Sequence, residues 1–140
     1  MELQDREAVY RQVIDAINHN DAHALNQFLA EDLIDHNPIP GQSMGRKGFQ
    51  EWMASARTSF PDLHGTIDEV MTASGNRVVG RVHWQGTQHG PFAGLAPTHK
   101  PVVFAVIHIV RFEADIIVEW WGVADIFSAV QQLGGKVVLA

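Results

Sequence analysis

The spacing of apolar residues changes near residue 63, from a helical period to a strand period. Upstream, Val9, Val13 and Ile17 recur at intervals of four, which predicts one face of an amphipathic helix that Asp5 can cap. Downstream, apolar and polar residues alternate in several runs, as they do in half-buried strands. A chain that changes period once in this way is expected to place helices against an antiparallel sheet, which is an α+β fold.

Turn residues divide both halves into further elements. In chain order we predict a short helix that Asp21 caps and that buries Leu25, Phe28 and Leu29, a turn-rich stretch over residues 33–41, a helix over residues 47–59, strands over residues 65–73, 77–89, 102–112 and 116–123, and a closing helix after Asp125 that ends at Leu133. A Gly- and Pro-rich loop over residues 90–101 separates the second and third strands. Nothing in this order suggests a second domain, so residues 1–140 are expected to form one.

The second and third predicted strands are each longer than ten residues, and paired strands of that length curl. A curved antiparallel sheet with about three helices covering its concave face would form a cone. Such a cone has an interior, which is where a small ligand would bind. We therefore expect one largely apolar pocket.

Composition excludes several classes of protein. The formal net charge is −6, and the ten Lys and Arg residues are spread along the chain, so no basic patch for nucleic acid is expected. The chain has no cysteine, which removes disulfides and thiolate metal sites. The first residues are too charged for a signal peptide, and the longest apolar run is too short for a membrane span. A cytoplasmic location with no membrane partner is the expectation.

One histidine stands in an unusual place. His108 shares strand parity with Phe104, Val106 and Val110, so it is predicted to face the same apolar side of the sheet. Burying its ring nitrogens costs free energy unless each finds a partner. The sequence leaves two interpretations open, a core histidine that bonds a neighbour or a histidine of the pocket.

Asp125 follows the most apolar predicted strand and stands among Trp120, Trp121 and Phe127. A carboxylate in such surroundings would be partly desolvated, as a general acid or base often is. The alternative is purely structural, because Asp125 also directly precedes a predicted helix that an aspartate would cap well.

The segment Asp35-His36-Asn37-Pro38 is equally ambiguous. Asx residues before proline commonly form turns, yet His36 and Asn37 could also hydrogen-bond a ligand carbonyl. A metal site is not expected, because no HxH or HExxH pair exists and His83 and His89 would lie about 20 Å apart on an extended strand.

Several segments together resemble the SnoaL-like polyketide cyclases, a family of the nuclear transport factor 2-like superfamily. They are, in order, Asp35-His36-Asn37-Pro38, Phe60-Pro61-Asp62-Leu63, residues 86–94 (GTQHGPFAG), Pro97-Thr98, Arg111-Phe112, residues 119–125 (EWWGVAD) and Gln132-Leu133-Gly134. The resemblance covers nearly the whole chain. His99 departs from it, where a glycine often follows Pro-Thr, and so does the Ala114-Asp115 turn.

The resemblance implies an ester cyclase that performs an intramolecular aldol condensation without metal or cofactor. It implies that Asp125 is the general acid/base, that Asn37 is a polar group of the pocket, and that His108 or His89 binds the substrate carbonyls. With these we group His36, Phe104 and Trp121 as candidate substrate contacts. The expected ligand is small, apolar or aromatic, and carries carbonyls.

Two other classes stay open from the sequence. One is a ketosteroid-isomerase-like or epoxide-hydrolase-like enzyme on the same fold, because proton abstraction in an apolar cone suits several reactions. The other is a ligand-binding or dimerisation module without turnover. The central strands are apolar on both parities, with Ile107 and Ile109 opposite Val106 and Val110, so a homodimer or larger homo-oligomer is expected.

Overall fold

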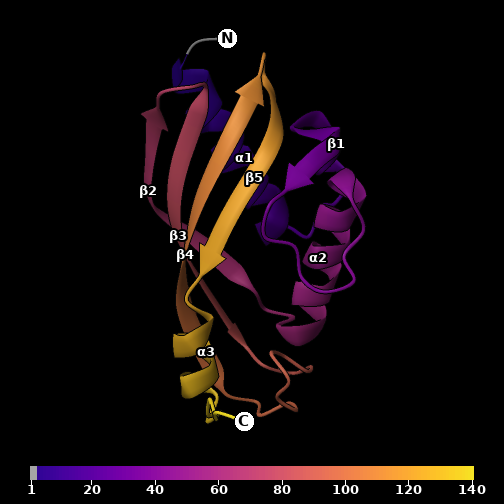
Figure 1. The fold of residues 1–140 in the computed structure, drawn as a ribbon, viewed down its shortest axis with the longest axis vertical. Helices are drawn as coiled ribbons and strands as arrows, with labels where there is room; N and C mark the ends of the chain where they lie inside the picture. Colours follow the sequence, from indigo (N-terminus) through magenta and orange to yellow (C-terminus); the bar gives the residue numbers. More distant parts are fainter. Residues whose placement is uncertain (1–2) are drawn as a thin grey trace.

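The structure, a computed structural model, describes residues 3–140 (Figure 1). Its elements are α1 (Leu3–Asn18), the 3₁₀ helix η1 (Ala24–Gln27), β1 (Leu29–Asp35), α2 (Gly45–Ser59), β2 (His64–Ala73), β3 (Arg77–Thr87), β4 (Pro101–Glu113), β5 (Ile116–Ala124) and α3 (Ile126–Gln132). The predicted α+β class is confirmed, and the long strands β2 to β5 follow α2 as a meander.

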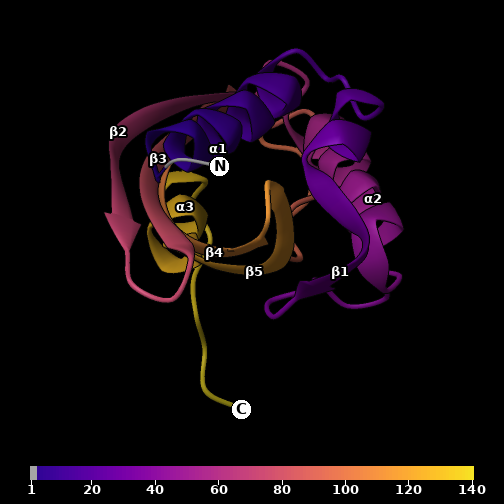
Figure 2. The ribbon, with the colours of Figure 1, turned by 90° about the horizontal axis from the view of Figure 1, so that it is seen from above.

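The five strands form one sheet in the order β1-β5-β4-β3-β2. Strands β2 to β5 pair antiparallel as predicted, but β1 pairs parallel to β5, so the sheet is mixed rather than antiparallel. The sheet curls around a central space, α1 and α2 lie across its concave side, and α3 packs on β4 (Figure 2). The expected cone is confirmed.

Strand β1 is the element that the sequence analysis missed. We predicted Leu29 in a helix and the following residues in a turn-rich stretch, whereas Leu29 and Leu33 are buried strand residues. The three residues between them include Glu31 and Asp32, which are exposed and which interrupt the alternation by which a strand is recognised. The strand is instead defined by its pairing with β5, which is a long-range contact that a local sequence pattern does not reveal.

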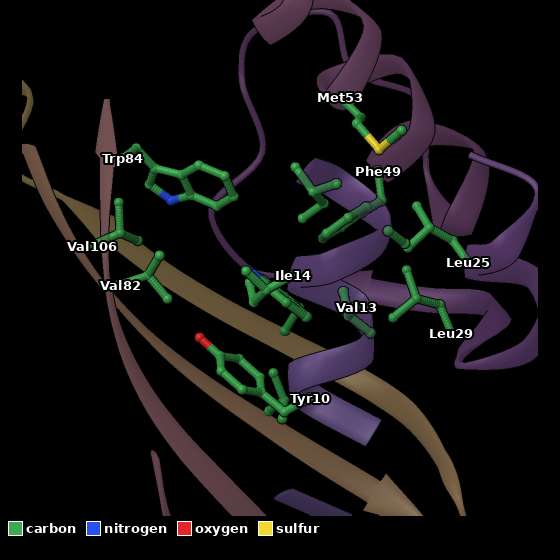
Figure 3. Packing of buried hydrophobic residues seen from close by; sticks show 14 of the residues in the cluster. Tyr10, Val13, Ile14, Leu25, Leu29, Phe49, Met53, Val82, Trp84 and Val106 are labelled. Carbon is green, nitrogen blue, oxygen red and sulfur yellow. The ribbon is translucent and has the colours of Figure 1, made fainter. Parts of the chain in front are cut away.

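The core lies between α1 and the concave face of the sheet. Tyr10, Val13, Ile14 and Ile17 of α1 are almost completely buried, and Figure 3 shows Tyr10 and Ile14 on the side of α1 that faces β3 and β4. On β3, Val78, Val82 and Trp84 alternate with exposed or half-buried residues. No helix within residues 3–140 is both long and apolar enough to cross a membrane.

Candidate functional site

A cavity of about 530 Å³ opens from the interior of the cone. Its walls are largely apolar and rich in aromatic rings, contributed by Phe49, Trp52, Phe60, Trp84, Phe92, Phe104 and Trp120. The polar side chains that line it are few: Asp35, Asn37, Ser55, Ser59 and His108. An apolar chamber with a few polar groups is typical of a site that orients a small organic ligand.

His108 lies in the middle of β4 and points into this cavity, with 6% of its surface exposed. Its Nδ1 atom lies 2.8 Å from the hydroxyl oxygen of Tyr10. Its ring packs against Trp120, with ring centroids 4.7 Å apart. Burial lowers the pKa of His108 to about 3, so the imidazole is neutral at ordinary pH. Both interpretations left open by the sequence therefore apply, because this histidine bonds a neighbour and also lines the pocket.

Glycines flank His108 on both neighbouring strands. Gly80 of β3 and Gly122 of β5 are its cross-strand partners in the sheet register. A Cβ on Gly80 would come within 2.2 Å of the Tyr10 hydroxyl, and a Cβ on Gly122 within 3.0 Å of His108 Cδ2. The two glycines leave space for the Tyr10 hydroxyl on one side of the histidine and for the Nε2 edge of its ring on the other.

The carboxyl end of β1 brings two more polar groups to the cavity. Asp35 Oδ1 accepts from the Asn37 backbone N–H at 3.0 Å, and Asp35 Oδ2 accepts from Gln42 Nε2 at 2.8 Å. Asn37 Oδ1 accepts from the Gly122 N–H at 3.0 Å. The Asn37 amide is thereby oriented, and its Nδ2 hydrogens have no acceptor among residues 3–140. Of the described residues that line the cavity, Asp35 is the single acidic one.

His36 and Trp121 lie outside this cavity. His36 is exposed and stacks on Trp121 with ring centroids 4.3 Å apart, and its Nε2 lies 3.2 Å from Glu119 Oε1. Hydrogen bonds from Arg111 and from His36 hold the pKa of Glu119 below its ordinary value. These contacts tie the end of β1 to β5, so they position Asp35 and Asn37 rather than line the cavity.

A buried glutamine organises the loop that closes one wall of the cavity. Gln88 is completely buried, its amide donates to the carbonyl of Gly90, and its Oε1 accepts from the Thr98 hydroxyl. Phe92 and its neighbours in this loop line the cavity. His89, which we grouped with the substrate contacts, is exposed and lies 3.2 Å from His99 between their Nδ1 atoms.

Asp125 is not desolvated as the sequence suggested. It is exposed, and its Oδ1 accepts from the Ser128 N–H at 3.0 Å, which makes it the N-cap of α3. Its chain neighbours Ala124 and Ile126 line the cavity, whereas Asp125 itself does not. The reason is strand parity, since Trp120, Gly122 and Ala124 are the β5 residues that face inward.

The structure therefore brings together three of the predicted site residues, Asn37, Phe104 and His108, and adds Asp35. Asp35 was quoted in the Asp-His-Asn-Pro motif, but only the position of β1 in the sheet reveals that its side chain reaches the cavity. No group of three or more His, Asp or Glu side chains among the described residues is arranged to hold a metal ion.

A curled sheet with helices across its concave side, a largely apolar cavity and a buried histidine together define a small-molecule site on the nuclear transport factor 2-like fold. Solved structures with this fold superpose over nearly the whole chain. TsrD from Streptomyces laurentii aligns with a TM-score of 0.88 and 21% identity over 97% of this chain and 99% of its own. AclR from Streptomyces galilaeus, a candidate hydroxylase, aligns with a TM-score of 0.81 and 23% identity over 95% and 98% of the two chains.

IdmH from Streptomyces antibioticus, a candidate polyketide cyclase, aligns with a TM-score of 0.81 and 26% identity over 92% of this chain and 98% of its own. The sequence model of the SnoaL-like polyketide cyclases matches residues 7–133. The chain therefore belongs to the SnoaL-like polyketide cyclase family. No curated protein sequence matches it.

Proposed function

We propose that this protein is a cyclase that closes a ring in a small keto ester of polyketide type by intramolecular aldol condensation, without metal or cofactor. The observation that carries the proposal is the meeting of a buried neutral histidine, a carboxylate and an oriented amide in one aromatic-walled cavity. Family membership supports the same class of reaction. We assign the acid/base role to Asp35, in place of the Asp125 that the resemblance alone implied.

The reaction needs one proton to be moved and returned. The Asp35 carboxylate takes a proton from a carbon flanked by two carbonyls, and the electron pair of that C–H bond passes into an enolate. His108 and Asn37 hold the carbonyl oxygens on which the negative charge develops. The enolate carbon then attacks a second carbonyl of the same molecule, a C–C bond forms, and the new alkoxide takes the proton back from Asp35.

The cavity wall supplies the rest of the catalysis. Phe49, Trp84 and Phe104 surround the substrate and hold it folded, so that its two reacting ends meet without the entropy cost of a free chain. The largely apolar walls would also strengthen a hydrogen bond to the enolate oxygen, because a bound substrate displaces water from them. Selectivity would thus come from the shape of the cavity, proton transfer from Asp35, and stabilisation of the enolate oxygens from His108 and Asn37.

The test is turnover of a panel of linear β-keto esters that carry a second carbonyl, followed by chromatography and mass spectrometry. An aldol product that keeps its water has the same mass as its linear precursor. The two are therefore distinguished by their retention times. We expect Asp35→Asn to lower kcat at least about 100-fold, the usual contribution of a general base. Asp125→Asn should retain activity, because asparagine is also a good N-cap.

Gln42→Ala is the matched control, since it removes the hydrogen bond that Gln42 Nε2 donates to Asp35 Oδ2 but keeps the carboxylate. A variant pattern in which Asp125→Asn is inactive and Asp35→Asn is active would return the acid/base role to Asp125. Retention of bound small molecules without turnover of any ester would favour the binding module instead.

A further inference from the structure

We propose that Tyr10 is a positioning residue that fixes His108 in the tautomer with its hydrogen on Nε2, so that the histidine presents a hydrogen-bond donor to the cavity. This inference deepens the proposed function and depends on it for its catalytic meaning. The tautomer itself follows from the packing around Tyr10 and can be measured without any substrate.

Tyr10 reaches His108 from the other side of the core. It lies on α1 and is completely buried, and its hydroxyl oxygen is directed at the sheet (Figure 3). Its ring packs against both Trp120, at a centroid distance of 6.2 Å, and His108, at 5.9 Å. The absence of a side chain at Gly80 gives the hydroxyl its place beside β3. These contacts fix the Tyr10 oxygen at the Nδ1 edge of His108.

The number of hydrogens that the two groups can share then decides the tautomer of His108. A tyrosine hydroxyl has one hydrogen to donate, and Nδ1 of His108 is its one partner among residues 3–140. If Nδ1 carried the hydrogen and donated to the tyrosine oxygen, the buried hydroxyl hydrogen would have no acceptor, which costs free energy. If the hydroxyl donates to Nδ1, both groups are satisfied. A neutral ring with its lone pair on Nδ1 carries its hydrogen on Nε2.

The Nε2 edge is the one left for a ligand in the cavity. No described residue is a hydrogen-bond partner of Nε2, and the side-chain-free Gly122 lies beside this edge of the ring. An Nε2–H group donates to a carbonyl oxygen and stabilises an enolate, but it cannot take a proton from carbon. The hydrogen bond from Tyr10 also polarises the ring and strengthens that donor. The structure thus separates the roles, with the proton acceptor on a carboxylate and the oxygen-binding donor on His108.

The experiment is a long-range ¹H–¹⁵N correlation spectrum of the ¹⁵N-labelled wild-type protein, with the His108 signals assigned by their loss in His108→Gln. We expect Nδ1 in the unprotonated, pyridine-like range and Nε2 in the protonated, pyrrole-like range. A hydrogen on Nδ1, or two tautomers in comparable amounts, would overturn the inference whether or not any variant folds.

Tyr10→Phe keeps the ring packing and removes only the hydroxyl. We expect it to move the Nδ1 signal toward that of a ring nitrogen without a hydrogen bond, and to lower kcat about tenfold, the effect of one neutral hydrogen bond, with less change in KM. Thr72→Val is the control, because it removes a 2.6 Å hydroxyl contact to Glu7 that also joins α1 to the sheet. It should leave the His108 signals unchanged.

An Nδ1 signal that stays in place in Tyr10→Phe would contradict the role given to Tyr10. The two proposals fail separately. The predicted tautomer in a protein that cyclises no ester leaves this inference standing and removes the proposed function. Turnover of an ester by a protein whose His108 carries its hydrogen on Nδ1 would support the proposed function and overturn the inference about Tyr10.

Discussion

At the scale of single residues, the burial of His108 makes the protein sensitive to acid. Its pKa is about 3 in the folded state against 6.5 in an open chain, so between these values the unfolded state binds a proton that the folded state does not. Stability is therefore unaffected by this group above pH 6.5 and is lost as the pH falls below it.

We predict that the stability lost between pH 7 and pH 5 is greater by about 2 kcal/mol in the wild type than in His108→Gln, which cannot titrate. The measurement is denaturant unfolding of both proteins at the two pH values. Acidic residues with a lowered pKa, such as Glu119 and Asp62, also contribute to the pH dependence of stability. Their contribution cancels in the comparison because they are present in both proteins. Parallel pH curves for the two proteins would show that His108 is not buried in its neutral form.

At the scale of secondary structure, the site depends on three adjacent strands in one register, Gly80 on β3, His108 on β4 and Gly122 on β5. We predict that Gly80→Ala costs about 1–3 kcal/mol of stability, because its Cβ would overlap the completely buried Tyr10. Gly122→Ala should cost less, since a shift of the His108 ring by a few tenths of an ångström relieves its contact, but it should impair ligand binding. Thermal unfolding and ligand titration measure the two effects. A Gly80→Ala protein as stable as the wild type would mean that Tyr10 does not lie against β3.

The long elements were predictable from sequence because their patterns are local. The alternation around His108 predicted that it faces inward with Phe104, and the structure agrees. The inward position of Asp35 was not predictable, because β1 is short, interrupted by exposed acids and defined by its parallel pairing with β5. The surroundings of Asp125 were not predictable for a related reason, since they depend on which β5 residues face inward and not on its aromatic neighbours in sequence.

At the scale of the whole molecule, the outer face of the sheet carries exposed apolar side chains. Val103, Ile107 and Ile109 of β4 and Val123 of β5 are between 37% and 69% exposed, and Ile107 is the cross-strand partner of Val123. A contiguous apolar surface of this kind on a sheet favours association with a second copy. We therefore retain the proposal of a homodimer or larger homo-oligomer formed through this face.

Sedimentation of the wild type at micromolar concentration is expected to give at least twice the 15.5 kDa of one chain, and Ile107→Asp is expected to sediment as a monomer. Met44→Asp is the control, because Met44 is 95% exposed but directly precedes α2 and belongs to neither β4 nor β5. A wild type that is monomeric under these conditions would contradict the proposed interface.

The central claim is that the cavity removes a proton from carbon with Asp35 while His108 holds the oxygen. The most direct measurement is the initial rate of deuterium incorporation from D₂O, followed by NMR, into a β-keto ester that lacks a second carbonyl and so cannot cyclise. We predict that the wild type and Asp125→Asn accelerate exchange above the buffer rate, and that Asp35→Asn and His108→Ala do not. Exchange at the buffer rate with the wild type, or acceleration that survives in Asp35→Asn, would contradict the account.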